Sequence, residues 1–336
     1  AVPVGRADAE APAANTTKEA EKLASPASLG AGLPAAALAS AEALLEAEDF
    51  DRAKTAFKTL QKSYPRAAEA YSGLGRVAFE FRRFEEAVKA LERAIQLAPG
   101  KADYHFQLGR ALTGRVGQVG IFKKMGVAGR LRKSFQKAAE LDPRHGPARL
   151  ALATYYANAP GIAGGSDKKA LRQARALKAF NPALHHQAMA RIAAEDEKND
   201  AARGHYRRSL AINYDPRVAA ELGALLQAME KWPEAFAVLT KALQAKPPVI
   251  GVSYLYGRAA SLSGSHLAEG EVALKAYFAA DDRRKFRRRR AAAEYYYGRI
   301  LEQTGRLGEA RRHYRKAIAI DDEQKDAKKA LRALDG

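Results

Sequence analysis

The densest group of chemically active side chains is a basic run, Arg283 to Arg290, which is followed by three tyrosines, Tyr295 to Tyr297. Basic residues interleaved with aromatic rings can hold phosphates and stack on bases, as a nucleic-acid site does. On a helix, however, four consecutive arginines point in all directions. We therefore expect a solvated or acid-binding helix start, with a nucleic-acid site as the alternative. The four arginines in question are Arg287, Arg288, Arg289 and Arg290.

Other groups that could carry catalysis lack the partners that such chemistry needs. The chain has no cysteine, which excludes disulfides, thiolate metal sites and cysteine nucleophiles. Ser166 to Lys169 fits the letters S-x-x-K without the companion motifs of that enzyme class. The adjacent His185 and His186 have no carboxylate at metal-ligand spacing. We predict no catalytic residue, no metal site and no cofactor, and a protein that is not an enzyme.

The net charge of the chain is +19, and it is unevenly distributed. Residues 1–49 hold three basic and eight acidic side chains, a net charge of −5, so the remainder carries +24. Such a field favours anionic partners, among them acidic protein segments, nucleic acid, anionic lipid and envelope polymers. No stretch approaches the roughly 18 apolar residues of a membrane span, so we predict no transmembrane segment.

The elements that position these side chains repeat at intervals of about thirty-four residues. One repeat carries Tyr71, Leu74, Gly75, Ala87, Leu91, Ala94 and Pro99. Small residues are needed where two antiparallel helices cross closely, and the proline ends the second helix. The first small residue recurs at spacings of 34, 34, 44, 37, 33, 34 and 41, as Ala41, Gly75, Gly109, Ala153, Ala190, Gly223, Gly257 and Gly298.

This spacing predicts an all-α solenoid of about eight helical hairpins, which form one array over residues 34–334. An extended leader rich in alanine and proline is predicted for residues 1–33. A polar helix at residues 325–334 is predicted to cap the last hairpin. The predicted hairpins span residues 34–67, 68–101, 102–145, 146–182, 183–215, 216–249, 250–290 and 291–324.

An insertion in the third hairpin, Thr113 to Gly129, is the first candidate for a binding element. Its five glycines should break any helix, while its apolar side chains are too numerous for a free loop. We expect an ordered loop that packs an apolar edge on the solenoid and presents basic residues. A binding role and a purely structural insert both remain open. The residues concerned are Ile121, Phe122, Lys123, Lys124 and Met125.

On the residues of this repeat, the chain resembles the tetratricopeptide-repeat family over about residues 34–334. The resemblance implies a right-handed superhelix whose first helices line a concave groove, which commonly binds peptides or holds complexes together. The segment PGIAGGSDKKA, residues 160–170, and the preceding FKKM, residues 122–125, further resemble a set of poorly characterised exported bacterial members.

The resemblance implies that position 9 of each repeat faces the concave wall. Five of the eight residues there are arginine, in the series Glu42, Arg76, Arg110, Thr154, Arg191, Ala224, Arg258 and Arg299. Aromatic residues at positions 5 and 12 lie between them, namely Phe79, Phe106, Tyr254 and Tyr295. Arginines among aromatics suit an extended anionic ligand, because guanidinium groups pair with carboxylate or phosphate and stack on rings. The alternative is that each arginine pairs with a glutamate of a neighbouring helix.

These features predict a non-enzymatic scaffold that binds an acidic or extended partner protein within a larger complex. The alternative is a protein that binds a polyanion, either nucleic acid or an anionic envelope polymer or lipid. The chain begins Ala1-Val2-Pro3 without methionine, so we expect removal of a signal peptide and export, with the periplasm as the compartment. A processed organellar protein or a cytoplasmic one remains the alternative.

Overall fold

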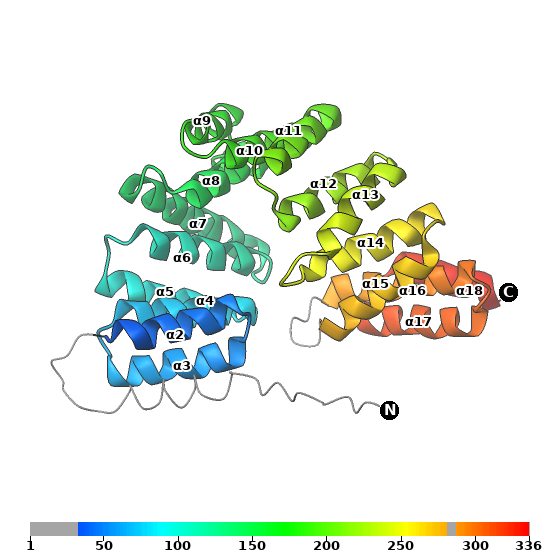
Figure 1. Cartoon of the computed structure of the whole chain (residues 1–336), viewed down its shortest axis with the longest axis horizontal. Coiled ribbons are helices and arrows are strands. Elements are labelled where there is room, and N and C mark those ends of the chain that lie inside the picture. The colour runs from blue at the N-terminus through cyan, green and yellow to red at the C-terminus, as the bar shows by residue number, and fades with distance from the viewer. Residues whose placement is uncertain (1–32, 281–286, 336) are drawn as a thin grey trace, which may run out of the picture. The chain divides into compact units, whose positions relative to one another are not determined.

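The computed structural model describes residues 33–280 and 287–335, and the regular secondary structure of these residues is all helix (Figure 1). The predicted leader therefore lies almost wholly outside the described residues. The helices are α2 (Ala35–Glu46), α3 (Phe50–Ser63), α4 (Ala68–Glu80), α5 (Phe84–Leu97), α6 (Ala102–Val116), α7 (Ile121–Leu141), α8 (Gly146–Asn158), the short 3-10 helix η1 (Gly161–Ala163), α9 (Asp167–Leu177), α10 (Pro182–Glu195), α11 (Asn199–Ile212), α12 (Pro216–Ala228), α13 (Trp232–Leu243), α14 (Ile250–Ser263), α15 (Leu267–Ala280), α16 (Arg287–Gln303), α17 (Leu307–Ile320) and α18 (Lys325–Asp335).

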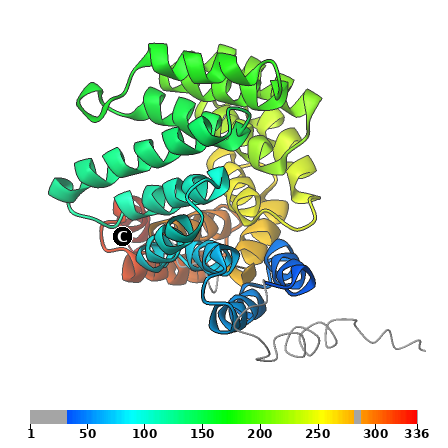
Figure 2. The same cartoon turned by 90° about the vertical axis from the view of Figure 1, so that its left-hand side faces the viewer.

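In the described part of the chain, the helices α2 to α17 follow one another as eight antiparallel pairs, and α18 packs on α17 as a single last helix (Figures 1 and 2). We call the two members of each pair the first and the second helix. The predicted solenoid of eight hairpins with a C-terminal helix is thus confirmed.

The helices divide into two compact units, residues 1–148 and 149–336, and the division falls in the first turn of α8. Within unit 1, the first helix α4 packs on the first helices α2 and α6. Within unit 2, the first helix α14 packs likewise on α12 and α16. Exposed side chains of one first helix therefore lie next to those of the neighbouring repeat.

The recurring small residue lies where the two helices of a pair touch. A Cβ atom added at Gly75 would stand 2.6 Å from the Leu91 side chain, and one added at Gly223 would stand 2.6 Å from Leu239. Real Cβ atoms do not approach carbon atoms so closely. The expected close crossing at this position is confirmed, and the second helix fills the space with a large side chain.

The turn that ends the first helix contains a residue in the left-handed backbone region. It lies seven positions after the small residue in six of the repeats, as Glu48, Arg82, Glu197, Glu230, Gly264 and Gly305. Their φ angles lie between 55° and 79°. Only two of the six are glycine, so composition gave no signal for this turn.

The prediction of a loop over Thr113 to Gly129 is wrong. Helix α6 continues to Val116 and α7 begins at Ile121, so only four residues are not helical. Gly114 lies inside α6, where an added Cβ atom would stand 2.3 Å from the ring of Phe84. This glycine is required by packing and does not break the helix.

Helix α7 remains continuous because one of its faces is buried along its length. Val127, Leu131 and Phe135 follow one another at intervals of four residues, and all three are buried. Gly126 and Gly129 each cost about 1 kcal/mol of helix propensity, an amount that the burial of several large apolar side chains outweighs. The insertion therefore lengthens the second helix of the third pair.

We expect Gly223→Ala to lower the free energy of unfolding by about 1–3 kcal/mol, because the new methyl group overlaps Leu239. Urea denaturation of the full chain measures this. Gly204→Ala in α11 is the control, since nothing lies within 4 Å of its Cβ position. That change should instead stabilise the protein by up to about 1 kcal/mol through helix propensity. Equal effects of the two substitutions would contradict the close-crossing explanation.

We expect Glu230→Gly to raise the free energy of unfolding by about 0.5–1 kcal/mol, because glycine adopts the left-handed conformation without steric cost. Glu230 has a φ angle of 55°, and its side chain is exposed. The reverse change, Gly305→Ala at a φ angle of 79°, should destabilise the protein by a similar amount. Thermal melts followed by circular dichroism measure both, and a lower melting temperature for Glu230→Gly would refute this account.

Candidate functional site

Three of the five arginines at repeat position 9 form ion pairs with glutamates of neighbouring first helices. Arg76 of α4 pairs with Glu42 of α2 at 2.5 Å. Arg110 of α6 lies 3.9 Å from Glu80 of α4. Arg191 of α10 pairs with Glu221 of α12. These arginines hold successive repeats together, as the structural alternative for the arginine row expects.

The Arg191 pair is the most extensive of these contacts. Its Nε donates to Glu221 at 2.9 Å, and a second guanidinium nitrogen donates to the other carboxylate oxygen at 2.5 Å. Tyr206 of α11 and Gln187 of α10 also donate to Glu221, at 3.0 and 3.1 Å. Burial and the adjacent carboxylate raise the pKa of the Tyr206 hydroxyl, which therefore remains a neutral donor. Four donors thus fix one carboxylate between three helices.

Two of the predicted wall aromatics are likewise engaged within unit 1. The guanidinium of Arg110 lies 4.5 Å from the centre of the Phe79 ring, a cation–π contact. The centre of the Phe106 ring lies 5.0 Å from the centre of the His145 ring and 5.9 Å from that of Phe135. Both rings pack against the chain itself.

The last two repeats differ, because the structure brings the remaining predicted residues together there. Tyr254 and Arg258 lie on α14, and Tyr295 and Arg299 lie on α16, which packs directly on α14. Tyr296 joins them, with ring centres 5.3 Å from Tyr295 and 6.1 Å from Tyr254. The guanidinium of Arg289 lies 5.7 Å from the centre of the Tyr254 ring. We call this surface the α14–α16 patch, and its members are Tyr254, Arg258, Arg289, Tyr295, Tyr296 and Arg299.

The two position-9 arginines of the patch lack the carboxylates that engage the other three. Within residues 33–280 and 287–335, neither Arg258 nor Arg299 forms an ion pair. The Nε atom of Arg258 is buried and has no hydrogen-bond acceptor among these residues. Both side chains are partly exposed. They are the members of the arginine row that retain the capacity to bind an anion.

Tyr254 and Tyr295 of the patch stay neutral near pH 7, because the pKa of each hydroxyl is raised. Burial and the adjacent Tyr296 raise the pKa of Tyr254 to about 12, against the opposing charges of Arg258 and Arg289. Burial also raises the pKa of Tyr295. The positive charge of Arg299 opposes this rise, and the negative charge of Asp326 in α18 adds to it. The patch therefore offers cations beside neutral rings, a combination that suits carboxylates flanked by apolar or aromatic groups.

The other predicted binding residues are not gathered into a site. Lys123, Lys124 and Met125 are exposed in the first turns of α7. The side chains of Ile121, Phe122, Arg287 and Arg288 lie outside the described part of the chain. Arg287 to Arg290 form the first turn of α16, and Arg290 lies 5.5 Å from the centre of the Phe278 ring. The basic run thus contributes Arg289 to the patch.

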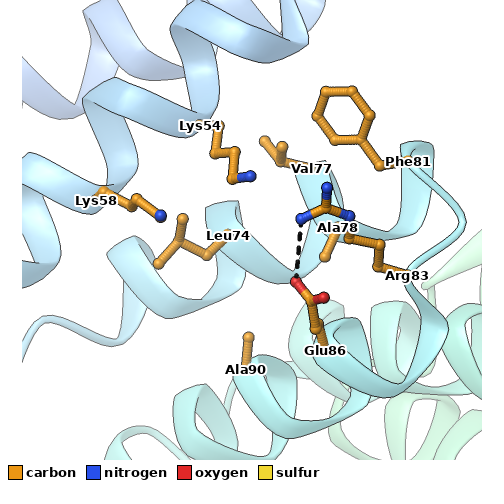
Figure 3. Close-up of a pocket in the computed structure, with 9 residues that line it drawn as sticks. All are labelled: Lys54, Lys58, Leu74, Val77, Ala78, Phe81, Arg83, Glu86 and Ala90. Carbon is orange, nitrogen blue, oxygen red and sulfur yellow. Dashed lines mark ion pairs between the residues drawn. The ribbon is translucent and has the colours of Figure 1, made fainter. Parts of the chain in front are cut away.

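Sequence reasoning missed a pocket on the second-helix side of unit 1 (Figure 3). Its floor comes from α4, and its rims come from the second helices α3 and α5. Lys54 and Lys58 form one rim, at a spacing of four residues on α3. The spacing of these two lysines on a predicted helix was a usable signal, but the pocket as a whole combines residues of three helices, and no single segment of the sequence indicates it.

Metal and membrane sites receive no support from the described residues. No group of three or more histidine, aspartate or glutamate side chains could hold a metal ion there. No helix among these residues combines the length and apolar character needed to cross a membrane.

Two tetratricopeptide-repeat family models match the chain, over residues 38–102 and 291–324. No sequence among curated proteins matches it. Several solved structures are similar. A chain of the APC/C hetero-tetramer Cut9–Hcn1 has a TM-score of 0.57 and 17% sequence identity, over 94% of this chain and 58% of that chain. The present chain thus spans little more than half the length of that relative.

Two further solved structures resemble this chain with similar TM-scores. The human IFIT1 dimer with m7Gppp-AAAA gives a TM-score of 0.55 and 17% identity, over 91% of this chain and 76% of that chain. A tetratricopeptide repeat protein from Parabacteroides merdae ATCC 43184 gives a TM-score of 0.52 and 11% sequence identity, over 85% of this chain and 99% of that chain. At such low identity these similarities establish the fold alone.

We expect Arg191→Gln to lower the free energy of unfolding by about 1–3 kcal/mol, because it leaves the partly buried Glu221 without its charged partner. Arg258→Gln should cost clearly less, since no carboxylate loses a partner. Urea denaturation of the two variants beside the parent chain compares them. Equal losses would show that Arg258 is as firmly engaged in the structure as Arg191.

Proposed function

We propose that the chain, which has the tetratricopeptide-repeat fold and matches models of that typically non-enzymatic family over residues 38–102 and 291–324, is a scaffold that binds a protein partner through the α14–α16 patch. The segment bound would be extended and acidic, with carboxylates beside apolar or aromatic side chains. The observation that carries this proposal is the pair Arg258 and Arg299, which lack an ion pair within the described residues.

The arrangement of the patch supports an extended ligand. Arg258 and Arg299 occupy the same repeat position on adjacent first helices, so a segment that crosses α14 and α16 meets both guanidinium groups. Each guanidinium can donate two parallel hydrogen bonds to one carboxylate. The partly exposed rings of Tyr254, Tyr295 and Tyr296 supply apolar contact area between them, as aromatic anchors do at protein interfaces.

The net positive charge of the chain supports the choice of an acidic partner. Opposite charge accelerates encounter and sets orientation, while the apolar contact of the rings supplies much of the affinity. A polyanion such as nucleic acid would draw mainly on charge spread over a wide surface. The two modes therefore differ in salt dependence, which is steep for counterion release from a polyanion.

We expect a fluorescein-labelled peptide of alternating glutamate and tyrosine to bind the full chain, and its glutamine–tyrosine analogue to bind at least about tenfold more weakly. Arg258→Gln with Arg299→Gln should weaken binding of the acidic peptide by about tenfold or more. The control is Arg312→Gln with Arg315→Gln on α17, which removes the same charge from exposed side chains of the same unit. This control should change the affinity by no more than about twofold.

A third variant tests the role of the free arginine without removing it. Ala224→Glu places a carboxylate at the repeat position that Glu42 occupies relative to Arg76, and it should neutralise Arg258 and weaken peptide binding. Fluorescence anisotropy at about 50 and 200 mM salt measures all variants. Equal weakening by the patch and control variants, with stronger binding of a single-stranded oligonucleotide that is lost at the higher salt, would replace the scaffold by a polyanion-binding function.

A further inference from the structure

The pocket in unit 1 lies between two second helices, on a different surface of the repeats from the arginine row. It encloses about 180 Å³ and is lined by Lys54 and Lys58 of α3, by Leu74, Val77 and Ala78 of α4, and by Phe81, Arg83, Glu86 and Ala90 at and after the following turn. Figure 3 shows the two lysines entering from the α3 side, opposite Arg83 and Glu86. The pocket thus lies between α3 and α5, above α4.

The floor of the pocket is apolar. Leu74, Val77, Ala78 and Ala90 present aliphatic groups to it, and Phe81 closes one end. The ring of Phe81 is held by an edge contact with Phe50, at a distance of 6.2 Å between ring centres. A volume of this size accepts one leucine-like side chain and is too small for a drug-sized ligand. The floor therefore selects a single large apolar side chain.

The rims of the pocket differ in charge. Arg83 pairs with Glu86 at 3.6 Å, so that rim is close to neutral. Neither Lys54 nor Lys58 has an ion pair within the residues that the structure describes. Lys54 lies 5.8 Å from the centre of the Phe81 ring, which keeps its ammonium group beside the apolar floor. The α3 rim thus carries two uncompensated positive charges.

The spacing of the two lysines specifies the conformation of the ligand. They lie four residues apart on a helix, about 6 Å along its axis. Two acidic side chains of a ligand match that distance when they lie three or four residues apart on a helix. A helix also fits a groove between two helices better than an extended strand, because its side chains insert at intervals of one turn.

We propose that this pocket binds an acidic amphipathic helix of a partner protein. The helix inserts one large apolar side chain between Leu74 and Phe81 and presents two carboxylates, one turn apart, to Lys54 and Lys58. The site lies in unit 1 and does not depend on the α14–α16 patch, so one scaffold carries two recognition surfaces for different conformations of acidic sequence.

The probe is a fluorescein-labelled synthetic helix of about fourteen residues, built on alanine and glutamine, with one leucine and two glutamates on one face. Fluorescence anisotropy against the full chain measures its affinity. We expect replacement of the leucine by alanine, or of both glutamates by glutamine, to weaken binding by about tenfold or more. Absence of any binding by the parent peptide at about 1 mM protein would overturn the proposal.

Two variants of the protein locate the site. Lys54→Gln with Lys58→Gln removes the charge of the rim, and Ala90→Leu fills the pocket from its partly exposed edge. Each should weaken binding by about tenfold, as judged at unchanged circular dichroism and melting temperature. The matched control is Lys123→Gln with Lys124→Gln, which removes two exposed lysines of the same unit and should change the affinity by no more than about twofold.

A final comparison separates this site from the proposed function. Arg258→Gln with Arg299→Gln should leave binding of the helical probe unchanged, while Lys54→Gln with Lys58→Gln should leave binding of the extended glutamate–tyrosine peptide unchanged. If Ala90→Leu binds the helical probe as the parent chain does, or if the lysine control is as damaging as the rim variant, the pocket is not the site of binding and the proposal fails.

Discussion

The close crossing of the two helices in each pair is the constraint on which the rest of the structure depends. At Gly75 and Gly223 the second helix brings a leucine to within 2.6 Å of where a Cβ atom would lie. The next residue along the first helix is position 9, which carries Arg76 in one of these repeats. Within unit 1, α4 contacts α2 and α6, and within unit 2, α14 contacts α12 and α16, so a charge at position 9 of these helices lies next to the neighbouring repeat. The packing that builds the solenoid thus places the position-9 side chains of neighbouring repeats near one another, and five of the eight are arginine.

Three of these arginines form ion pairs with glutamates that occupy three different repeat positions. Arg76 takes a glutamate at position 9 of the preceding repeat, Arg110 takes one at position 13 of the preceding repeat, and Arg191 takes one at position 6 of the following repeat. These contacts satisfy guanidinium groups that would otherwise be partly buried without a partner. In unit 1 and at the start of unit 2 the arginine row therefore joins repeats, whereas among the described residues Arg258 and Arg299 form no ion pair with a carboxylate.

Much of the fold was predictable because it follows from a local rule that the sequence repeats. The positions of Gly75, Gly223 and the other small residues gave the number and order of the helical pairs, since nothing larger fits the crossing. The glycines of the insertion were misleading, because Gly114 is small for packing against Phe84 and Gly126 is tolerated on an open helix face. A glycine in the sequence can mark a backbone conformation that only glycine adopts, or a site where no side chain fits, and the sequence alone does not distinguish the two. That distinction requires the neighbouring helix to be in place.

The two proposed binding surfaces were harder to predict, because each depends on side chains from more than one helix. Single residues of the α14–α16 patch were predicted from their repeat positions, but the pocket beside Lys54 combines side chains from three helices and has no signature within any one of them. In the sequence its lysines look like any other surface lysines, and only the folded structure shows the apolar floor beside them.

The repeat positions nevertheless explain why the arginines without an ion pair among the described residues lie in the last two repeats. A carboxylate reaches position 9 from position 9 or 13 of the preceding repeat, or from position 6 of the following one. For Arg258 these three positions hold Ala224, Ala228 and Tyr296. None is acidic, and one is itself a ring of the patch. For Arg299 the two preceding positions hold Arg258 and Leu262, so neither of them supplies a carboxylate. A chain that needed arginine here only to join its repeats would have a glutamate at one of these positions, as the earlier repeats do. Its absence leaves the pair of guanidinium groups on which the proposed binding of an acidic partner rests.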